Sequence, residues 1–249
     1  MLSKSLIALA ASVSGALAAT PAGFEPGSET GLVVTFGSVA ALDGTVVAKD
    51  ITQTSPKLAT QSKLDGTSFA ILMIDLDIPT NNPPQTSTLL HWMQTGLTQS
   101  SSAVALNTTT GSINAFVLSV PSDVTAFAPY LGPAPPARIP LSHRYTEIVV
   151  DTSDASEDAL STLQTAAANR SAFSAQSVLT SAGLADKVVA GNFFNVTNPG
   201  PLSDTKSGGN GTTTGSPPVQ TPVTGAAVSQ RAGASLLAIT LAGVALFAL

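Results

Sequence analysis

The sequence predicts one domain of the mainly β (α+β) class, with several strands followed by one or two helices. Short runs rich in β-branched and aromatic residues, separated by glycine and proline turns, occupy the chain as far as residue 150. The helix-like stretch follows them, an order typical of α+β domains. The chain has no cysteine, so its core alone must hold the domain together.

Both ends of the chain have the composition of processing signals. Residues 1–19, MLSKSLIALAASVSGALAA, combine an early lysine, an apolar middle and small final residues, the pattern of a secretory signal peptide. Residues 232–249 are uncharged and apolar, and a Gly/Ser/Thr/Pro-rich linker, 201–231, precedes them. A polar spacer before an apolar tail is typical of a GPI-attachment signal, whose tail is removed. Residues 20–200 then form the folded domain.

The C-terminal pattern leaves two alternatives. An apolar tail of this length can also be a tail-anchored transmembrane helix, since about 20 apolar residues span a bilayer. The signal peptide favours the GPI anchor, with Asn210 as the first candidate for attachment and Gly208 and Gly225 as alternatives. We therefore expect a secreted protein at the cell surface or in the cell wall, GPI-anchored to the plasma membrane.

Charge and sequons bear on partners and modification. The net charge of −5 and the lack of a Lys/Arg cluster argue against nucleic acid as a partner. The N-x-S/T sequons at Asn107, Asn169 and Asn195, with a fourth at Asn210, are compatible with glycosylation on a secretory route.

The first predicted strands precede residue 77. Residues 31–40 are rich in β-branched residues between glycines, and residues 45–51 form a β-like run after the turn dipeptide Asp43-Gly44. Residues 68–76 are almost continuously apolar at strand length, which predicts a central strand buried on both faces.

The remaining elements follow two loops. Proline and asparagine predict a loop over residues 78–88, and proline and glycine a second over residues 129–140. Strands are predicted at residues 89–97, 113–120 and 146–150. Residues 156–186, rich in Ala, Leu and Gln after an acidic start, predict one helix of about 10–18 residues, or two, with Gly183 as a stop.

Four polar residues border these loops and are candidates for a site. Asp75 and Asp77 end the apolar strand and, by alternation, point the same way, so in a partly buried pocket one should have a raised pKa. Alternatively, one aspartate caps the loop through the local backbone. His91 and His143, the only two histidines, could be ordinary core or surface residues, but both adjoin loops of the kind that carry sites.

The stretch FAILMIDLDIPTNNPPQTSTLLHW resembles the signature of the phosphatidylethanolamine-binding protein family, the relatives of Raf kinase inhibitor and carboxypeptidase Y inhibitor. That signature is an aromatic, an apolar run, D-P-D-x-P, a small polar residue, ten residues and a histidine. Phe69, Asp75, Asp77, Pro79 and His91 match it in spacing. Two departures are Leu76 in place of proline and Thr80 in place of the usual Ser, Asn or Gly.

A second motif of the same family, Y-x-G-x-x-P-P followed by H-R-Y, is similar to residues 130–136 and His143-Arg144-Tyr145. The loop between them is about one residue longer than usual, with Pro140 where glycine is typical. The segment VAGNFFNV, residues 189–196, is similar to the closing segment of the family, so the resemblance spans residues 24–197.

The resemblance to a fungal-type secreted member implies a large central antiparallel sheet, a smaller sheet and a peripheral C-terminal helix. It also implies a small pocket for phosphate or another small anion, or for a phospholipid head group such as phosphatidylethanolamine, whose ammonium could meet the second carboxylate. It implies no cofactor, metal or catalytic residue. By matched position the ligand-binding residues are Asp75, Asp77, Pro79, His91, Pro136, His143 and Tyr145.

Other functions remain as alternatives. The resemblance also allows an inhibitor of a serine carboxypeptidase, or a signalling regulator, acting through its surface. A hydrolase using Ser142 is less favoured, because no G-x-S-x-G elbow is present and Ser142 and His143 would face opposite ways on a strand. Two histidines and two aspartates could hold a metal, but no compact motif such as H-E-x-x-H is present.

Overall fold

The computed structural model describes residues 20–200. The predicted signal peptide, the linker with Asn210 and the apolar tail lie outside these residues. Within them, no helix is both long and apolar enough to cross a membrane. The strands are β1 (Leu32–Phe36), β2 (Val39–Ala40), β3 (Lys57–Thr60), β4 (Phe69–Pro79), β5 (Thr86–Gln99), β6 (Val104–Thr108), β7 (Gly111–Ser119), β8 (Ser142–Asp151) and β9 (Val188–Thr197). The helices are α1 (Glu157–Ala167) and α2 (Ala175–Ser181), with 3₁₀ turns η1 (Asp50–Gln53) and η2 (Ala185–Lys187).

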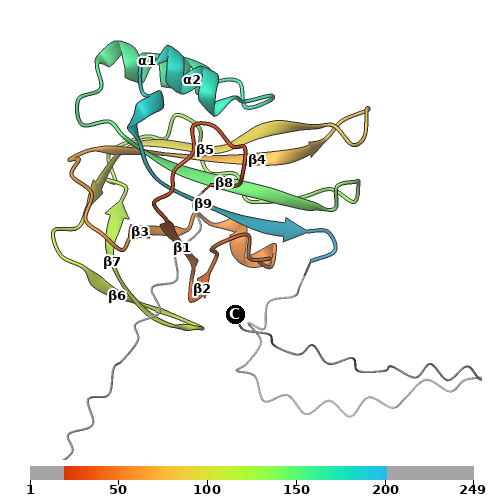
Figure 1. The fold of residues 1–249 in the computed structure, drawn as a ribbon, viewed down its shortest axis with the longest axis horizontal. Coiled ribbons are helices and arrows are strands. Elements are labelled where there is room, and N and C mark those ends of the chain that lie inside the picture. Colours follow the sequence, from red (N-terminus) through yellow and green to blue (C-terminus); the bar gives the residue numbers. More distant parts are fainter. Residues whose placement is uncertain (1–19, 201–249) are drawn as a thin grey trace, which may run out of the picture. The chain divides into compact units, whose positions relative to one another are not determined.

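The strands form one connected sheet in the order β2-β1-β3-β7-β5-β4-β8-β9, with β6 paired to β7. Every pairing between named strands is antiparallel, as the resemblance implies. The long strand β5 joins the two halves, because its end pairs with β7 through Thr98 and Gln99. The expected larger and smaller sheets are therefore continuous here. Helices α1 and α2 lie together over one face of the larger half (Figure 1).

Strand β4 is the central strand that its apolar run predicts. It lies between β5 and β8, and its residues from Phe69 to Asp77 are buried except for Leu76. On one face Ile71 and Met73 pack in a core shared with β1, β3 and β9. On the other face Leu72 and Ile74 pack in a second core beneath the two helices. Burial on both faces explains why this strand lacks polar alternation.

The helical region contains two helices, which decides between the alternatives that the sequence left open. The side chain of Ser156 accepts a hydrogen bond from the backbone N–H of Ala159 and caps α1. Ser174 caps α2 in the same way. Gly183, with φ of 70°, follows the end of α2, a left-handed conformation that glycine adopts without strain. The predicted stop is confirmed.

The prediction of a strand over residues 45–51 is wrong. Only Val46 forms a bridge, an isolated parallel one to Asn195 on β9, and η1 follows. The chain turns at Asp43 and Gly44, both with positive φ, and then touches β9 over too few residues to extend a ladder. The sequence also misses β3 and β6, which have four and five residues and too few apolar positions for a recognisable pattern.

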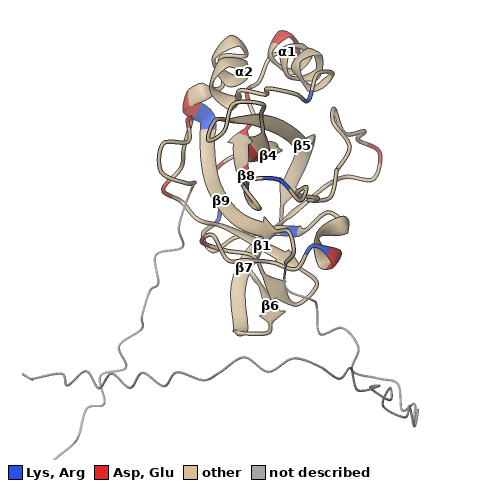
Figure 2. Ribbon diagram, turned by 90° about the vertical axis from the view of Figure 1, so that its right-hand side faces the viewer, with Lys and Arg blue, Asp and Glu red and all other residues tan. Residues whose placement is uncertain are grey.

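In the described part of the chain, the charged residues are scattered along the ribbon, and most of the strands carry none (Figure 2). Asp75, Asp77 and Glu147 are nevertheless buried in the sheet, as are both histidines. Because burying a charged or polar group is costly unless it is paired, these residues mark where structure or function demands polarity.

Candidate functional site

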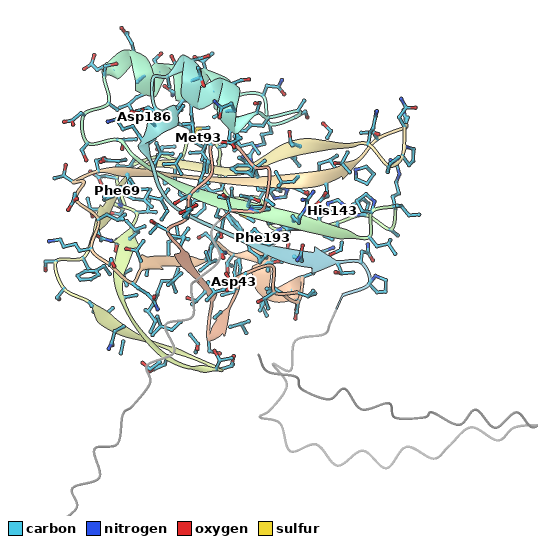
Figure 3. The ribbon with its side chains drawn as sticks, viewed as in Figure 1. Asp43, Phe69, Met93, His143, Asp186 and Phe193 are labelled. Carbon is cyan, nitrogen blue, oxygen red and sulfur yellow. The ribbon has the colours of Figure 1, made fainter. Side chains whose placement is uncertain are left out.

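Three neighbouring strands bring the predicted polar residues together. Asp75 on β4 pairs in register with Tyr145 on β8, and β5 places His91 on the other side of β4. His143 begins the buried part of β8, toward the end of the sheet opposite Phe69 (Figure 3). The side chains of Asp75, His91, His143 and Tyr145 are all at most 3% exposed. They form what we call the Asp75 cluster.

Asp75 is the hydrogen-bonding centre of this cluster. Its Oδ2 lies 2.8 Å from His143 Nδ1 and 3.9 Å from His91 Nε2. Its Oδ1 accepts a hydrogen bond of 2.8 Å from the backbone N–H of Asp77, so it also makes the local backbone contact that the sequence left open. Because a carboxylate only accepts hydrogen bonds, His143 carries a proton on Nδ1 and Asp75 orients its imidazole. His143 Nε2 is thereby free for another partner.

A backbone carbonyl orients the ring of His91 in the way that Asp75 orients His143, through Nδ1. Its Nδ1 lies 2.7 Å from the carbonyl oxygen of Leu131, and a carbonyl can only accept, so Nδ1 carries the proton. Burial lowers the pKa of His91 below its ordinary value, although the Leu131 carbonyl and Asp75 act in the opposite direction. At neutral pH the ring is therefore uncharged, and its Nε2 faces the cluster as a hydrogen-bond acceptor.

Tyr145 supplies a hydroxyl group to the cluster. Its ring packs edge-on against His91, with centroids 5.1 Å apart, and stacks on Phe194 at 5.6 Å. Burial, and then the charge of the nearby Asp75 carboxyl, raise the pKa of Tyr145 well above its ordinary value, while the backbone of Ala134 acts in the opposite direction. Neither group has the geometry of a hydrogen bond with the hydroxyl. The hydroxyl therefore keeps its proton at every physiological pH and can donate it.

Three polar atoms of the cluster are buried without a hydrogen-bond partner: His91 Nε2, His143 Nε2 and the Tyr145 hydroxyl. A buried polar group left unsatisfied costs about 1–3 kcal/mol. Both imidazoles pack against the ring of Tyr145. Three unsatisfied groups so close together make an expensive arrangement for a core unless a small polar partner satisfies them.

Asp77 has a different role from the one expected. Its Oδ2 accepts hydrogen bonds of 2.8 Å from both the backbone N–H and Nε of Arg144, and its Oδ1 accepts one of 2.7 Å from Nη2. Burial alone would raise the pKa of Asp77, but these bonds outweigh it and lower the pKa. The irregular register between Asp75 and Ile78 turns the two carboxylates to separate partners. Asp77 is thus not the carboxyl with a raised pKa, and both of its oxygens accept hydrogen bonds from Arg144.

The two predicted prolines lie outside this set of hydrogen bonds. Pro79 ends β4 opposite Thr86, and Pro136 is exposed on the loop before β8. Leu76, where the family has proline, packs against the core beneath the helices, while its carbonyl accepts a hydrogen bond from Thr86. This substitution therefore acts on the opposite side of β4 from Asp75. Trp92 packs edge-on against Tyr130 in the core between the half-sheets.

The alternative chemistries find little support in the geometry of residues 20–200. The exposed hydroxyl of Ser142 is hydrogen-bonded to Thr197, and His143 is bonded to Asp75. No group of three or more His, Cys, Asp or Glu side chains in these residues could hold a metal ion.

The structure distinguishes the three sequons that it describes. The side chains of Asn107 and Asn169 are on exposed residues. Asn195 is half-buried on β9, and its amide nitrogen donates to the carbonyl of Gly44 at 2.6 Å. A glycan requires that same nitrogen, so Asn195 is the least accessible of the three.

Sequence reasoning missed two groups that shape the site, the Leu131 carbonyl and the side chain of Arg170. A backbone carbonyl leaves no signal in a sequence. Arg170 lies between the helices, as the middle residue of the sequon Asn169-Arg170-Ser171. No sequence pattern connects it to His91, almost eighty residues earlier. Arg144 stood in a recognised motif, but only its hydrogen bonds to Asp77 show what it does.

A family model for phosphatidylethanolamine-binding protein matches residues 34–194 of the chain. The chain belongs to the phosphatidylethanolamine-binding protein family. A relative from Talaromyces stipitatus, named phomoidride biosynthesis cluster protein N, is 31% identical over 191 residues, which cover 70% of this chain and 88% of that protein.

Solved structures similar to this chain include members of the same family. One is carboxypeptidase Y inhibitor complexed with its cognate proteinase, with 19% identity, a TM-score of 0.47, and coverage of 69% of this chain and 84% of that one. Another is phosphatidylethanolamine-binding protein from Plasmodium vivax, with 16% identity, a TM-score of 0.45, and coverage of 67% and 84%.

Proposed function

We propose that this protein is a binding protein that takes one small oxyanion, phosphate or the phosphate of a phospholipid head group, at the Asp75 cluster. One observation carries the proposal: His91 Nε2, His143 Nε2 and the Tyr145 hydroxyl are buried together without partners. An oxyanion can accept a hydrogen bond from each of them once both rings are protonated, which would satisfy all three groups at once.

Proton uptake accompanies binding in this proposal. Each ring already donates from Nδ1, to Leu131 in one case and to Asp75 in the other. Either Nε2 can donate to an anion only if its imidazole is charged. Because burial lowers the pKa of His91 below its ordinary value, anion affinity should increase as the pH falls below neutrality.

The structure changes what a phosphatidylethanolamine head group could contact. The resemblance lets the ammonium meet the second carboxylate, Asp77. In the structure, however, both oxygens of Asp77 accept hydrogen bonds from Arg144. Recognition in this proposal therefore rests on the phosphate. Binding assays separate the two sources of this phosphate. They compare free sulfate or phosphate with vesicles of phosphatidylethanolamine or phosphatidylcholine. Binding of the free anion but not of vesicles indicates a soluble ligand, and binding of vesicles but not of the free anion indicates a membrane lipid.

The decisive variant is Tyr145→Phe, which removes one hydroxyl and keeps the ring that stacks on Phe194. Losing a hydrogen bond to a charged ligand costs about 1.5–3 kcal/mol, so sulfate binding measured by calorimetry at pH 6 should weaken at least tenfold. The matched control is Tyr130→Phe, since Tyr130 is the only other tyrosine and its hydroxyl donates to Thr52 outside the cluster. Equal affinities in both variants would refute the proposed site.

The same variants separate binding from protease inhibition. An inhibitor of a serine carboxypeptidase acting through its surface would keep its potency in Tyr145→Phe, whereas the proposed function needs the buried hydroxyl. We propose no enzymatic role, because Ser142 and His143 have separate partners and form no nucleophile–base pair.

We also propose that the protein is secreted and held at the cell surface by a GPI anchor, on the composition of residues 1–19 and 201–249. Release from cells by a phosphatidylinositol-specific phospholipase is expected. Retention after phospholipase treatment, together with loss of retention when residues 232–249 are deleted, would instead favour a transmembrane tail.

A further inference from the structure

The edge of β5 that carries His91 is covered by two segments from elsewhere in the chain. On one side of His91, the segment after α1 bonds to β5 through Ala172 N–H to Thr88 O at 2.9 Å and Leu90 N–H to Arg170 O at 2.8 Å. On the other side, residues 128–131 bond to Met93 and to His91. The two covering segments meet beside His91.

The side chain of Arg170 joins these segments at their meeting point. Its Nη1 donates to the carbonyl oxygens of Leu90 at 3.1 Å and His91 at 3.0 Å. Its Nη2 donates to the carbonyl oxygen of Pro129 at 2.7 Å. One guanidinium thus holds three carbonyls, two on β5 and one on the loop that crosses it. We call this set of bonds the Arg170 clamp.

The loop held by the clamp is the one that orients the imidazole of His91. Two residues after Pro129, the Leu131 N–H donates to the His91 carbonyl at 2.8 Å, and the Leu131 carbonyl accepts from His91 Nδ1 at 2.7 Å. The position of the Leu131 carbonyl decides which ring nitrogen carries the proton of neutral His91. That choice decides whether Nε2, the nitrogen that faces Asp75, carries a proton or a lone pair.

We propose that Arg170 is a positioning residue for the Asp75 cluster: by tying Pro129 to β5, it holds the Leu131 carbonyl against His91 Nδ1. This contact fixes the Nδ1–H tautomer of the neutral ring, and it orients the charged ring so that Nε2–H points into the cluster. The part of this inference that concerns ligand affinity rests on the proposed oxyanion binding. The part that concerns the tautomer stands on the hydrogen bonds alone.

The chemistry of the guanidinium explains why an arginine is needed. It presents several N–H donors in a rigid planar fork, so it can hold carbonyls on two segments at fixed angles. A lysine keeps the positive charge, but its three N–H donors share one nitrogen at the end of a flexible stem and have no fixed planar arrangement. Arg170 also contributes to the lowered pKa of His91 through its charge, which Arg170→Lys retains. The lysine variant therefore removes the clamp and keeps the charge.

The test is nitrogen NMR of the His91 ring in the ligand-free protein, combined with sulfate binding at pH 6. In the wild type, neutral His91 should be a single Nδ1–H tautomer. In Arg170→Lys, the Nε2–H form of the neutral ring should become detectable. Sulfate affinity should fall about tenfold, because the charged ring loses the fixed Leu131 acceptor that orients it. The matched control is Arg138→Lys, because exposed Arg138 also donates to a carbonyl, that of Thr80 at 3.2 Å, away from His91. It should change neither measurement.

The outcomes separate this inference from the proposed function. A tautomer and a sulfate affinity that are both unchanged in Arg170→Lys would overturn the positioning role and leave oxyanion binding intact. A shifted tautomer in a protein that binds no oxyanion would support positioning and end the proposed function. If Arg170→Lys does not fold, measurements on the wild type decide. Fast exchange of the Arg170 guanidinium protons with solvent, or a mixture of His91 tautomers, would contradict the clamp. Slow exchange together with a single tautomer would support it.

Discussion

Glu147 offers the sharpest test of the energetics of this fold. It lies on β8 between Met73 on β4 and Asn192 on β9, with no exposed surface. Neither carboxyl oxygen has a hydrogen-bond partner in the structure. Burial raises the pKa of Glu147 from 4.5 to about 8. The nearby amide of Asn192, which donates to the Ala41 carbonyl and not to the carboxyl, opposes this shift only in part. Glu147 is therefore a neutral acid in the folded protein at pH 7, whereas the unfolded chain exposes it as a carboxylate.

The magnitude follows from this difference in pKa. Below pH 4.5 both states are protonated, and Glu147 contributes its full stability. Between pH 4.5 and about 8 only the folded state keeps the proton, so the free energy of unfolding falls by about 1.4 kcal/mol per pH unit. Above about pH 8 both states are ionised, and the total loss has reached about 5 kcal/mol. Stability is thus lost as the pH rises.

Glu147→Gln removes this titration with little change in shape. Urea denaturation at pH 5, 6, 7 and 7.5 gives the unfolding free energies of both proteins. The value for Glu147→Gln minus that for the wild type should increase by about 1.4 kcal/mol per pH unit as the pH rises. Comparing the two proteins cancels every other titrating group. Glu29→Gln, at an exposed position, is the control and should follow the wild type. Parallel curves for wild type and Glu147→Gln would show that Glu147 is ionised or hydrated in the folded state, contrary to the reasoning.

Three further predictions concern the site and its surroundings. Asp77→Asn should cost only about 1 kcal/mol of stability, because the Arg144 partner is partly exposed, and it should leave sulfate affinity unchanged. Since Arg144 lowers the pKa of Asp77, the unfolding free energies of wild type and variant should converge below that lowered pKa. A tenfold loss of sulfate binding in the variant would instead place Asp77 in the site. Sulfate remains a dianion between pH 7.5 and 5.5, so any change in its affinity over this range comes from the protein. The affinity should rise on acidification by up to about tenfold per pH unit for each imidazole that takes up a proton, and calorimetry in buffers of different ionisation enthalpy should detect that uptake. An affinity that does not change with pH would contradict the role of His91. In a host that glycosylates secreted proteins, Asn107→Gln should increase electrophoretic mobility, whereas Asn195→Gln should not, because its amide is bonded to Gly44.

The sequence predicts well those features that depend on one local pattern. The continuous apolar run of β4 predicts a strand buried on both faces, and the structure has it. The spacing of Asp75, His91 and the H-R-Y motif predicts the family, which the comparisons show. Alternation holds at Leu76 but does not predict the partner of Asp77, because the ladder there is irregular and the neighbouring strand supplies Arg144. The fate of a side chain at a strand end depends on the neighbouring strand, which local periodicity does not contain.

The separation of the two aspartates sets the charge balance of the cluster. Two carboxylates in the cluster would cancel two protonated imidazoles and leave no attraction for an anion. Because Arg144 neutralises Asp77 at the end of the strands, the cluster holds one carboxylate, Asp75, against the two imidazoles of His91 and His143. With both rings protonated it has an excess of one positive charge, which matches a singly charged oxyanion such as a phosphodiester. In the proposed function, Asp77 would therefore favour anion binding by keeping its charge paired with Arg144 and out of the cluster.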